Sequence, residues 1–332
     1  MKAIIHEGTP GIDGLHKKED FPEQSVGQGE VKIRLKVAGM NHRDLFVLQR
    51  HKENEPALII GSDGSGVISE VGEGVTRYKV GDEVIIIPSL RWRTKSVAPP
   101  DDFDILGLPD HGTFAETIVL KEEQVALKPD YLSFEEAGIL ALSGLTGYRA
   151  LFTQGQLTSG QTVFIPGIGG GVATLMLQMA KSVGAKVIVS SRSEEKRKKA
   201  LELGATLAIG NDEDWSKVLK NTKVDLVIES VGAATWNRSL KVLKKGGTIV
   251  AFGSSTGDIV EMNLREFFYG QYRFFGSTMG SIEEFHEMLK LFSNYQIKPI
   301  VDRIFDIDDY EKAFDWLEKG QQFGKIALKI NE

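Results

Sequence analysis

The sequence predicts an α/β protein with a doubly wound parallel sheet and a separate β-rich domain. Two observations predict the parallel sheet. Residues 162–191 form a strand, a glycine loop, a helix and a second strand in turn, and strands alternate with helices from about residue 143 onward. A third observation predicts the β-rich domain, because residues 1–140 consist largely of short β-prone runs separated by glycine and aspartate. A length of 332 residues is sufficient for two such domains.

The glycine loop lies between a buried strand and an amphipathic helix. Val163–Ile165 is a continuous apolar run, which is typical of a parallel strand buried on both faces. Apolar residues then recur at helical spacing up to Val183, and Gly184 is suited to end that helix. Backbone N–H groups in such a loop can approach a pyrophosphate at the positive end of the helix dipole. The segment is therefore predicted to be a Rossmann unit whose dinucleotide-binding residues are Gly167, Gly169, Gly170, Gly171 and Val172.

The strict six-residue glycine fingerprint is absent from this loop, because its last position falls on Val172 or Ala173. A tight turn that serves only packing is the alternative. The strand before the loop, the helix after it and the second strand at the expected distance favour the dinucleotide.

The residues after the second strand predict which dinucleotide is bound. A preference for NAD usually places Asp or Glu there, to accept hydrogen bonds from the ribose 2′-hydroxyl. This chain has Ser191 and Arg192 instead, and Lys196 follows one turn into the next helix. Guanidinium and hydroxyl groups can bind a 2′-phosphate that a carboxylate would repel, so the predicted cofactor is NADP(H). Ser191 or Ser193 can also cap that helix, and the two roles are compatible.

The composition is that of an ordinary soluble globular protein, with 41% hydrophobic and 26% charged residues. The net charge of −6 argues against nucleic acid as a main partner. No cysteine is present, which excludes disulfides and thiolate metal sites. The N-terminal segment lacks the features of a signal peptide, and no apolar run approaches the roughly 20 residues that span a bilayer. A cytoplasmic location without a membrane partner is expected.

The remaining elements follow from the same patterns. Residues 41–49 are expected to form a short helix, and residues 90–112 a long surface lobe without periodicity. Two further helices are expected at residues 282–295 and 310–319. Strands are expected at residues 2–5, 30–37, 66–71, 83–88, 113–120, 206–209, 225–230, 248–253, 274–277, 301–305 and 325–330.

Five further motifs occur in order along the chain: Gly61-Ser-Asp-Gly-Ser-Gly, Val80-Gly-Asp-Glu-Val, His111-Gly-Thr-Phe-Ala-Glu, Gly144-Leu-Thr-Gly-Tyr and Phe323-Gly-Lys-Ile. Together with the glycine loop they resemble the medium-chain dehydrogenase/reductase superfamily, which contains zinc alcohol dehydrogenases and zinc-free quinone oxidoreductases. The resemblance implies a discontinuous GroES-like catalytic domain (residues 1–142 and 284–332) and a Rossmann NADP(H)-binding domain (residues 143–283), with the active site where they meet. It also implies a homodimer or homotetramer, assembled through a sheet edge near residues 258–272.

The positions that hold zinc in the zinc members carry other residue types here. Aligned by motif, the catalytic ligands fall on Asn41, Ser62 and Leu142, and the glutamate beside the second ligand becomes Asp63. Zinc requires thiolate, imidazole or carboxylate ligands. Residues 90–112 correspond to the structural zinc lobe and contain no cysteine. The chain therefore resembles the zinc-free, quinone oxidoreductase-like members, and no zinc is expected.

Three residues at these positions are predicted to be catalytic. Without a metal, hydride transfer to a conjugated acceptor is less demanding than transfer to an isolated ketone, because the charge spreads to an enolate or quinol oxygen. The amide of Asn41 is expected to donate to that oxygen, with Ser62 or a water molecule as second donor and proton source. Asp63 is expected to orient the loop. A purely structural, buried asparagine is the alternative for Asn41.

The resemblance also implies cofactor contacts outside the glycine loop. His42 is expected at the pyrophosphate, Thr146 near the nicotinamide, and Lys325 near the cofactor. Other contacts are expected where the later strands end, since ligands bind at that edge of such sheets. These residues are Ser230, Val231, Phe252, Gly253, Ser254, Ser277, Thr278 and Met279. For each of them a simple strand-end turn is the alternative.

The sequence thus predicts a zinc-independent, NADPH-dependent oxidoreductase that transfers hydride to quinones, enones or related carbonyl compounds. Two alternatives stay open. One is a metal-free alcohol or aldehyde dehydrogenase, and the other is an NADPH-binding protein with little turnover that serves a sensing or structural role.

Overall fold

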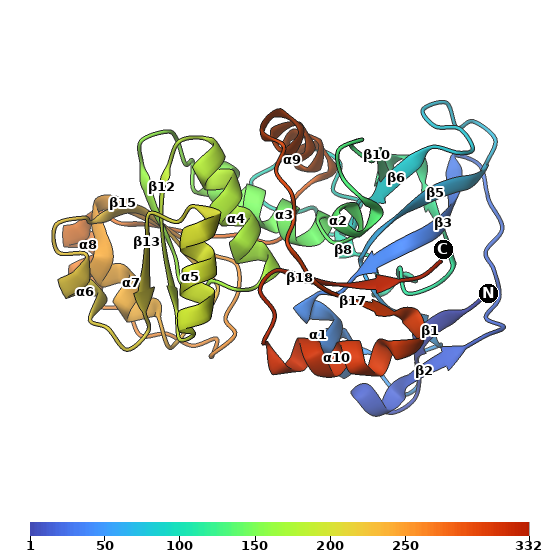
Figure 1. The fold of residues 1–332 in the computed structure, drawn as a ribbon, viewed down its shortest axis with the longest axis horizontal. Coiled ribbons are helices and arrows are strands. Elements are labelled where there is room, and N and C mark those ends of the chain that lie inside the picture. Colours follow the sequence, from blue (N-terminus) through green and yellow to red (C-terminus); the bar gives the residue numbers. More distant parts are fainter. Residues whose placement is uncertain (332) are drawn as a thin grey trace. The chain divides into compact units, whose positions relative to one another are not determined.

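The computed structural model describes residues 1–331 (Figure 1). The chain forms two compact units. The first unit consists of residues 1–145 together with the segment that begins at Gly280, and the second consists of residues 146–279. Within residues 1–331, no helix is long and apolar enough to cross a membrane.

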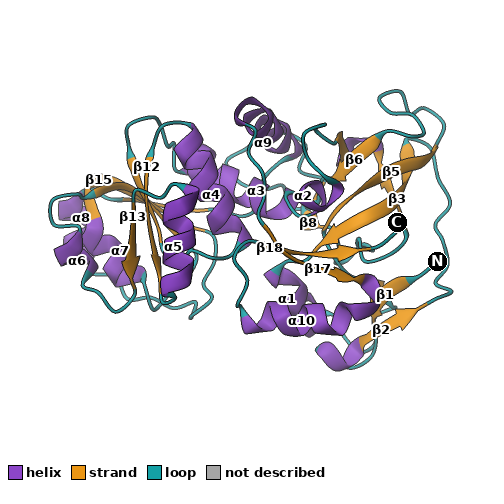
Figure 2. Ribbon diagram, in the orientation of Figure 1, coloured by secondary structure: helices purple, strands orange, loops and turns teal. Residues whose placement is uncertain are grey.

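Most strands of the first unit belong to one seven-stranded sheet, with the order β10-β6-β5-β3-β18-β17 and with β9 paired to β3 (Figure 2). All of its pairs are antiparallel except β17 with β18. A second sheet has the order β2-β1-β4, and β7 pairs with β8. The strands of this unit are β1 (Ala3–His6), β2 (Leu15–Lys18), β3 (Glu30–Gly39), β4 (Leu58–Ile59), β5 (Asp63–Val71), β6 (Glu83–Ile86), β7 (Ser89–Leu90), β8 (Asp104–Ile105), β9 (Thr117–Lys121), β10 (Val125–Leu127), β17 (Val301–Asp306) and β18 (Lys325–Lys329).

The helices of the first unit bury one apolar face each. In α10 (Tyr310–Lys319), the buried residues Tyr310, Ala313, Phe314 and Leu317 have the i, i+3, i+4, i+7 spacing of a single helix face. Phe314 packs edge-to-face on Phe114, with 6.3 Å between the ring centroids. The other helices are α1 (His42–Arg50), α2 (Phe134–Gly138), α3 (Ala141–Tyr148), which continues past residue 145, α9 (Ile282–Tyr295), and the 3₁₀ turns η1 (Ile12–Gly14), η2 (Glu122–Gln124) and η4 (Ile307–Asp309).

The lobe at residues 90–112 is mostly exposed or half-buried, as predicted, but one buried residue anchors it. Trp92 is 1% exposed and packs edge-to-face on Phe103 at 5.2 Å. The Trp92 carbonyl accepts a hydrogen bond of 2.8 Å from Ile282 N, at the first residue of α9. A single buried tryptophan carries no periodicity, so the sequence pattern could not reveal that this lobe is anchored to a distant helix.

The second unit is a six-stranded parallel sheet with the order β13-β12-β11-β14-β15-β16. Figure 1 shows α4 and α5 on one side of this sheet and α7 and α8 on the other. The order reverses between β11 and β14, which is the topological switch point of a doubly wound sheet. Its elements are the π-helical turn η3 (Arg149–Gln154), β11 (Thr162–Ile165), α4 (Gly171–Ser182), β12 (Lys186–Ser191), α5 (Glu194–Leu203), β13 (Leu207–Gly210), α6 (Trp215–Val218), β14 (Val224–Glu229), α7 (Trp236–Val242), β15 (Leu243–Ala251), α8 (Leu264–Gly270) and β16 (Arg273–Gly276).

The predicted α/β fold class is confirmed, and both long C-terminal helices occupy the predicted residues. The largest difference in a strand is at β15, which begins at Leu243 instead of residue 248. Leu243 pairs with Val224, and an irregularity then shifts the register so that Thr248 pairs with Leu226. The Lys-Gly-Gly segment predicted to be a turn before the strand is thus a bulge within it.

Two glycines with the same backbone angle allow a test of packing before β5. Gly61 and Gly81 both have a φ of 95°. A Cβ at Gly61 would lie 2.3 Å from Phe114 Cδ1, whereas a Cβ at Gly81 would have no neighbour within 4 Å. Both Gly→Ala variants pay the left-handed backbone penalty of about 1–2 kcal/mol, and Gly61→Ala adds overpacking of about 1–3 kcal/mol. Urea unfolding is expected to show the larger loss for Gly61→Ala, and equal losses would contradict this packing.

Candidate functional site

Three neighbouring strands of the first unit meet at one polar cluster. In the seven-stranded sheet β5 and β18 flank β3, and Gly39 of β3 lies opposite both Asp63 and Ala327. Asn41 follows β3, Asp63 begins β5, and Lys325 begins β18. All three side chains are buried, with exposed fractions of 5%, 0% and 5% in that order. We call Asn41, Asp63 and Lys325 the Lys325 cluster.

Hydrogen bonds join every pair within the Lys325 cluster. Lys325 Nζ donates to Asn41 Oδ1 and, at 3.3 Å, to Asp63 Oδ2. Asn41 Nδ2 donates to Asp63 Oδ2 at 3.0 Å. The backbone N–H of Leu142 donates to Asp63 Oδ1 at 2.7 Å, so both carboxylate oxygens have partners. Removing one member of a buried ion pair typically costs about 3–5 kcal/mol, since the other charge is left uncompensated.

The partners of the Asn41 amide fix which way it points. An ammonium group only donates and a carboxylate only accepts, so a reversed amide would face donor to donor and acceptor to acceptor. The amide donor predicted for a substrate oxygen therefore points at Asp63, with Gly39 O at 3.5 Å. In this arrangement Asn41 orients the ammonium group and the carboxylate, and its contact with a substrate stays a prediction.

A second carboxyl group, that of Asp44, lies beside the cluster. Asp44 Oδ2 accepts from Asn41 N at 2.7 Å, while the buried Oδ1 has no hydrogen-bond partner among residues 1–331. Burial raises the pKa of Asp44 to about 6, although Asn41 N–H, Arg43 and Lys325 act in the opposite direction. Burial likewise lowers the pKa of Lys325, and the carboxyl groups of Asp63 and Asp44 oppose that shift.

The predicted second donor, Ser62, is part of a different contact. Its hydroxyl donates to Leu106 O at 2.7 Å and accepts from Arg43 Nη1 at 2.8 Å. Arg43 Nη1 also donates to Leu106 O at 3.0 Å. The sequence analysis did not identify Arg43, and the only available signal was its place between His42 and Asp44. The Ser62 proton is thus engaged by Leu106, so Ser62 as a proton source stays a prediction that requires this bond to open.

The residues at the predicted metal positions do not fit zinc. Asn41, Ser62 and Leu142 offer no thiolate, imidazole or carboxylate, and the Lys325 ammonium group contacts the first of them. In the described part of the chain, no three His, Asp or Glu side chains are grouped as a metal ion would require. This set of donors supports the prediction that the protein works without zinc.

The second unit gathers most of the predicted cofactor residues at the carboxyl edge of its parallel sheet. Gly167 to Val172 follow β11, Ser191 ends β12, and eight further residues follow β14, β15 and β16. Arg192 comes directly after β12, and Lys196 lies in α5. Two close approaches link these loops. A Cβ at Gly167, where φ is 78°, would lie 2.9 Å from Val231 Cγ2, and a Cβ at Gly253 would lie 3.2 Å from Ser230 O. Ser254, Thr278 and Gly253 are exposed, Ser230, Val231, Phe252 and Ser277 are half-buried, and Met279 is buried.

The first turn of α4 is open to an anion. Its N-cap is Gly170, no side chain of the described residues caps it, and its first turn contains no acidic residue. By contrast, the Ser193 hydroxyl caps α5 by accepting from Lys196 N at 3.2 Å, and two glutamates occupy that first turn. A Cβ at Gly169 would lie 3.2 Å from Lys196 Nζ, so the Lys196 ammonium group lies over the loop. The loop therefore fits a pyrophosphate.

The segment after β12 fits a polar ribose or phosphate group. The Ser190 hydroxyl is buried without a partner among residues 1–331, and Ser277 Oγ is in the same state after β16. Ser191 is 7% exposed and its Oγ accepts from Ser193 N at 3.2 Å. Arg192 is exposed, whereas Arg197 Nη1 donates to Ser191 O at 2.7 Å. Sequence reasoning missed Arg197, which holds the strand end from one turn into α5.

Glu229 is a third residue that the sequence analysis missed. It ends β14 and is 1% exposed. Its Oε1 accepts from Val231 N at 2.8 Å, Gly232 N at 3.1 Å and Thr235 Oγ1 at 2.8 Å, and its Oε2 accepts from Ser239 Oγ at 2.8 Å. An acidic residue at the end of an apolar strand was the available signal. Glu229 holds the predicted cofactor loop at residues 230–232 in place.

Two other predicted contacts lie on helices. His42 is the first residue of α1, is exposed, and packs edge-to-face on Phe46 at 5.7 Å. Thr146 lies in α3 and is 8% exposed. Their roles toward a cofactor stay predictions.

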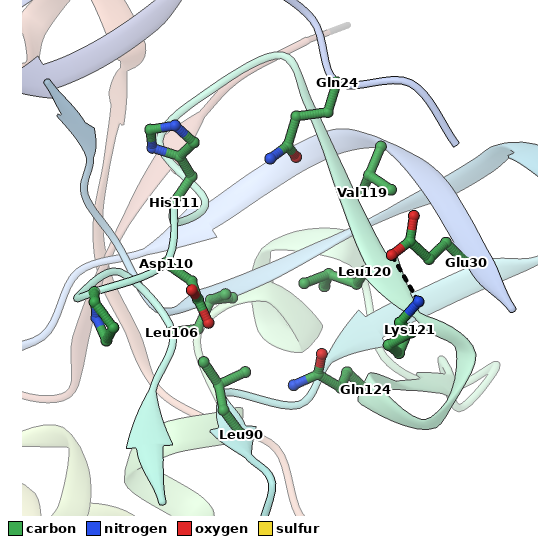
Figure 3. Close-up of a pocket in the computed structure, with 11 residues that line it drawn as sticks. Gln24, Glu30, Leu90, Leu106, Asp110, His111, Val119, Leu120, Lys121 and Gln124 are labelled. Carbon is green, nitrogen blue, oxygen red and sulfur yellow. Dashed lines mark ion pairs between the residues drawn. The ribbon is translucent and has the colours of Figure 1, made fainter. Parts of the chain in front are cut away.

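A pocket of about 350 Å³ lies elsewhere in the first unit (Figure 3). The ion pair of Glu30 with Lys121, at 2.8 Å, lies on one side of it and His111 on the other. Its lining contains none of the predicted site residues. One of its lining residues, Leu106, also contacts the site, because its carbonyl accepts from Ser62 and Arg43.

A doubly wound sheet with an open glycine loop and a discontinuous β-rich unit define the two-domain, nucleotide-dependent oxidoreductases. Residues 27–130 match the alcohol dehydrogenase GroES-like domain, and residues 171–294 match the zinc-binding dehydrogenase family. The chain is 33% identical to a zinc-type alcohol dehydrogenase-like protein of Leptosphaeria maculans, with 92% of this chain and 91% of that protein covered. The chain belongs to the medium-chain dehydrogenase/reductase superfamily.

Other similar proteins carry different names. An acryloyl-coenzyme A reductase of Sulfurisphaera tokodaii is 29% identical over 99% of this chain and 100% of its own. The crystal structure of an NAD-dependent alcohol dehydrogenase has a TM-score of 0.93 and 32% identity, with 100% of each chain covered. The structure of a quinone oxidoreductase from Coxiella burnetii has a TM-score of 0.81 and 29% identity, with 100% of this chain and 99% of that chain covered. The chain is thus similar to both alcohol dehydrogenases and reductases.

The pKa of Asp44 leads to a prediction about stability. Its folded-state value of about 6 lies above the ordinary 3.8, so its contribution to stability is full below about pH 4 and is lost as the pH rises through about 6. The shift corresponds to roughly 3 kcal/mol. Relative to the parent, Asp44→Asn is expected to gain stability by up to that amount between pH 4.5 and 7.5, measured by urea unfolding. Asp101→Asn, at an exposed carboxylate, is the control, and a pH-independent difference for Asp44→Asn would contradict the prediction.

Proposed function

We propose that this chain is a zinc-independent, NADPH-dependent oxidoreductase that reduces quinones, enones or related conjugated carbonyl compounds. The observation that carries the proposal is the buried ammonium group of Lys325, held by Asn41, at a position where the family resemblance expects a metal ligand, and by Asp63. The positive charge of this group would repel a divalent cation. It does suit a substrate oxygen that becomes negative during reduction.

The second unit supplies the groups that would hold NADPH. The open first turn of α4 and Lys196 suit the pyrophosphate, and Ser191, Arg192 and the unpartnered Ser190 hydroxyl suit the ribose with its 2′-phosphate. The bound cofactor would supply a hydride, that is, one proton together with two electrons. Glu229 would keep the loop at residues 230–232 in place beside it.

The choice of a conjugated substrate rests on the charge that the chain can stabilise. A conjugated acceptor spreads the developing charge onto one oxygen, which a few hydrogen-bond donors stabilise without a Lewis acid. Two similar proteins support this choice by their names, since one is an acryloyl-coenzyme A reductase and the other a quinone oxidoreductase. Ser62 and Asn41 are proposed to line the same site, as in the sequence analysis.

A metal-free alcohol or aldehyde dehydrogenase is the second candidate. It is favoured by the similarity to a zinc-type alcohol dehydrogenase-like protein and to an NAD-dependent alcohol dehydrogenase. The third possibility, an NADPH-binding protein with little turnover, predicts binding without reduction of any acceptor.

One experiment distinguishes these functions. NADPH oxidation is measured with a quinone, an enone, an enoyl thioester and an aldehyde, and NADP⁺ reduction with a primary alcohol, each with and without a chelator. Turnover of quinone or enone that the chelator does not change, with no stoichiometric zinc in elemental analysis, is expected. Turnover of only the aldehyde and alcohol indicates the second candidate, binding without turnover indicates the third, and activity that requires bound zinc contradicts the proposal.

The cofactor preference yields a separate prediction. Arg192→Asp places a carboxylate where the 2′-phosphate would lie, and loss of one charge-assisted contact costs about 1.5–3 kcal/mol. Fluorescence titration is expected to show tighter binding of NADPH than NADH by the parent, and at least tenfold weaker NADPH binding by the variant. Arg265→Asp, an exposed cation on α8, controls for overall charge and should change neither affinity much. Equal affinities of the parent for both cofactors would refute the preference.

We also propose that the chain assembles through β16, which ends the parallel sheet. Its Phe274 and Phe275 are 45% and 39% exposed, and Phe268 and Tyr269 on α8 are 53% and 65% exposed. An unpaired apolar edge of this kind suits an isologous contact with a second copy. A monomeric mass by light scattering would count against it.

A further inference from the structure

The ammonium group of Lys325 has one more hydrogen-bond donor than the structure uses. A protonated lysine carries three N–H donors and no acceptor. Two of them meet Asn41 Oδ1 and Asp63 Oδ2. No acceptor for the third lies within reach among residues 1–331, although the side chain is only 5% exposed. A buried, charged donor without a partner carries a large desolvation penalty, and a bound ligand that accepts a hydrogen bond from the third N–H would relieve it.

The two partners of the ammonium group are themselves held in place by hydrogen bonds. Asp63 has partners on both oxygens, and its Oδ1 is fixed by Leu142 N from the start of the next helical segment. Asn41 cannot turn over, because its two ends match an ammonium group and a carboxylate. Lys325, Asn41 and Asp63 come from strand ends that are joined in a single sheet. Such preorganised donors are the ones that stabilise charge without reorganising during a reaction.

We propose that Lys325 is a catalytic residue whose third N–H binds the substrate oxygen on which negative charge develops. The inference rests on the proposed function and deepens it. Asn41 and Asp63 are then positioning residues, which aim the ammonium group and keep it charged. The family resemblance implies a cofactor contact for Lys325, and the proposal assigns its third N–H to the substrate instead.

The chemistry balances around this contact. Hydride adds to the electrophilic carbon of the conjugated carbonyl and forms a C–H bond, and the π-electron pair moves onto the oxygen. The Lys325 N–H stabilises that oxyanion without leaving nitrogen. A proton from water then completes the product, so the substrate gains two electrons and two hydrogens while NADPH is oxidised to NADP⁺. The same positive charge would hold an oxyanion that is present from the start, such as a phenolate.

That last property provides a test that does not require turnover. The probe is 4-nitrophenol, whose ionised form is identified by its visible absorbance, titrated into the protein with NADP⁺ present. The test variant combines Lys325→Met with Asp63→Asn, so that no buried charge is left unpaired. Neutral 4-nitroanisole, which has the same ring without an ionisable oxygen, reports whether the variant still binds the ring. Circular dichroism and NADPH titration report whether the variant is folded.

A matched control exists in the same unit. Lys128 is also buried, at 9% exposed, and its ammonium group donates to Leu132 O at 2.8 Å and pairs with Glu83 at 2.9 Å. Lys128→Met therefore removes a buried ammonium group whose donors have partners. It is expected to bind the phenolate as the parent does.

The expected result is at least tenfold weaker binding of the phenolate by the double variant, with 4-nitroanisole and NADPH affinities close to those of the parent. With the best acceptor, kcat is expected to fall by about 10²–10³ while KM changes little, as for the loss of one oxyanion donor. Equal phenolate affinity in parent and double variant, or no phenolate binding by the parent, would overturn the inference. Absence of acceptor turnover by the parent would instead refute the proposed function, since the phenolate titration is read independently.

Discussion

The polar cluster of the first unit centres on a buried ion pair, between Lys325 and Asp63. Each charge would be very unfavourable alone in the interior, and neither reaches water to an appreciable extent. The pair is tolerated because β5, β3 and β18 are adjacent and in register, which brings the ends of all three strands together. Asn41 and the Leu142 N–H then satisfy the remaining atoms. A change in the register of these strands would therefore also separate the charges of the site.

In the second unit, the main electrostatic feature is the difference between the N-termini of α4 and α5. Every α-helix begins with unpaired N–H groups. In α5 the Ser193 hydroxyl accepts from one of them, and two glutamates lie in the first turn. The glycine-rich start of α4 has no capping side chain among the described residues, and the Lys196 ammonium group lies over the glycine loop. Both helices are of similar length and lie on the same side of the sheet. Their capacity to bind an anion therefore differs because of their first turns. One start is closed by the chain and the other is available to an anion.

Much of the fold could be predicted, since it depends on local periodicity. The strand, glycine loop and helix at residues 162–182 and the helices α9 and α10 agree closely with the patterns of apolar residues. The lobe anchored by Trp92 and the bulge at Lys-Gly-Gly could not be predicted, because each depends on a partner far away in the sequence. The roles of the site residues could not be predicted either. Asn41 and Lys325 are 284 residues apart in the chain, and they come into contact only because the sheet brings their strand ends together.

The sequence by itself determined the fold class and the glycine loop, and it places Asn41, Ser62 and Leu142 where the family resemblance expects zinc ligands. These are properties of short segments, and residue types at known spacings suffice to recognise them. Only the tertiary structure decided that an ammonium group from the last strand contacts Asn41, and that the Asn41 amide and the Ser62 hydroxyl are already engaged. Hydrogen bonds between distant strands have no signature in a single sequence, because their energy depends on where folding brings the partners together.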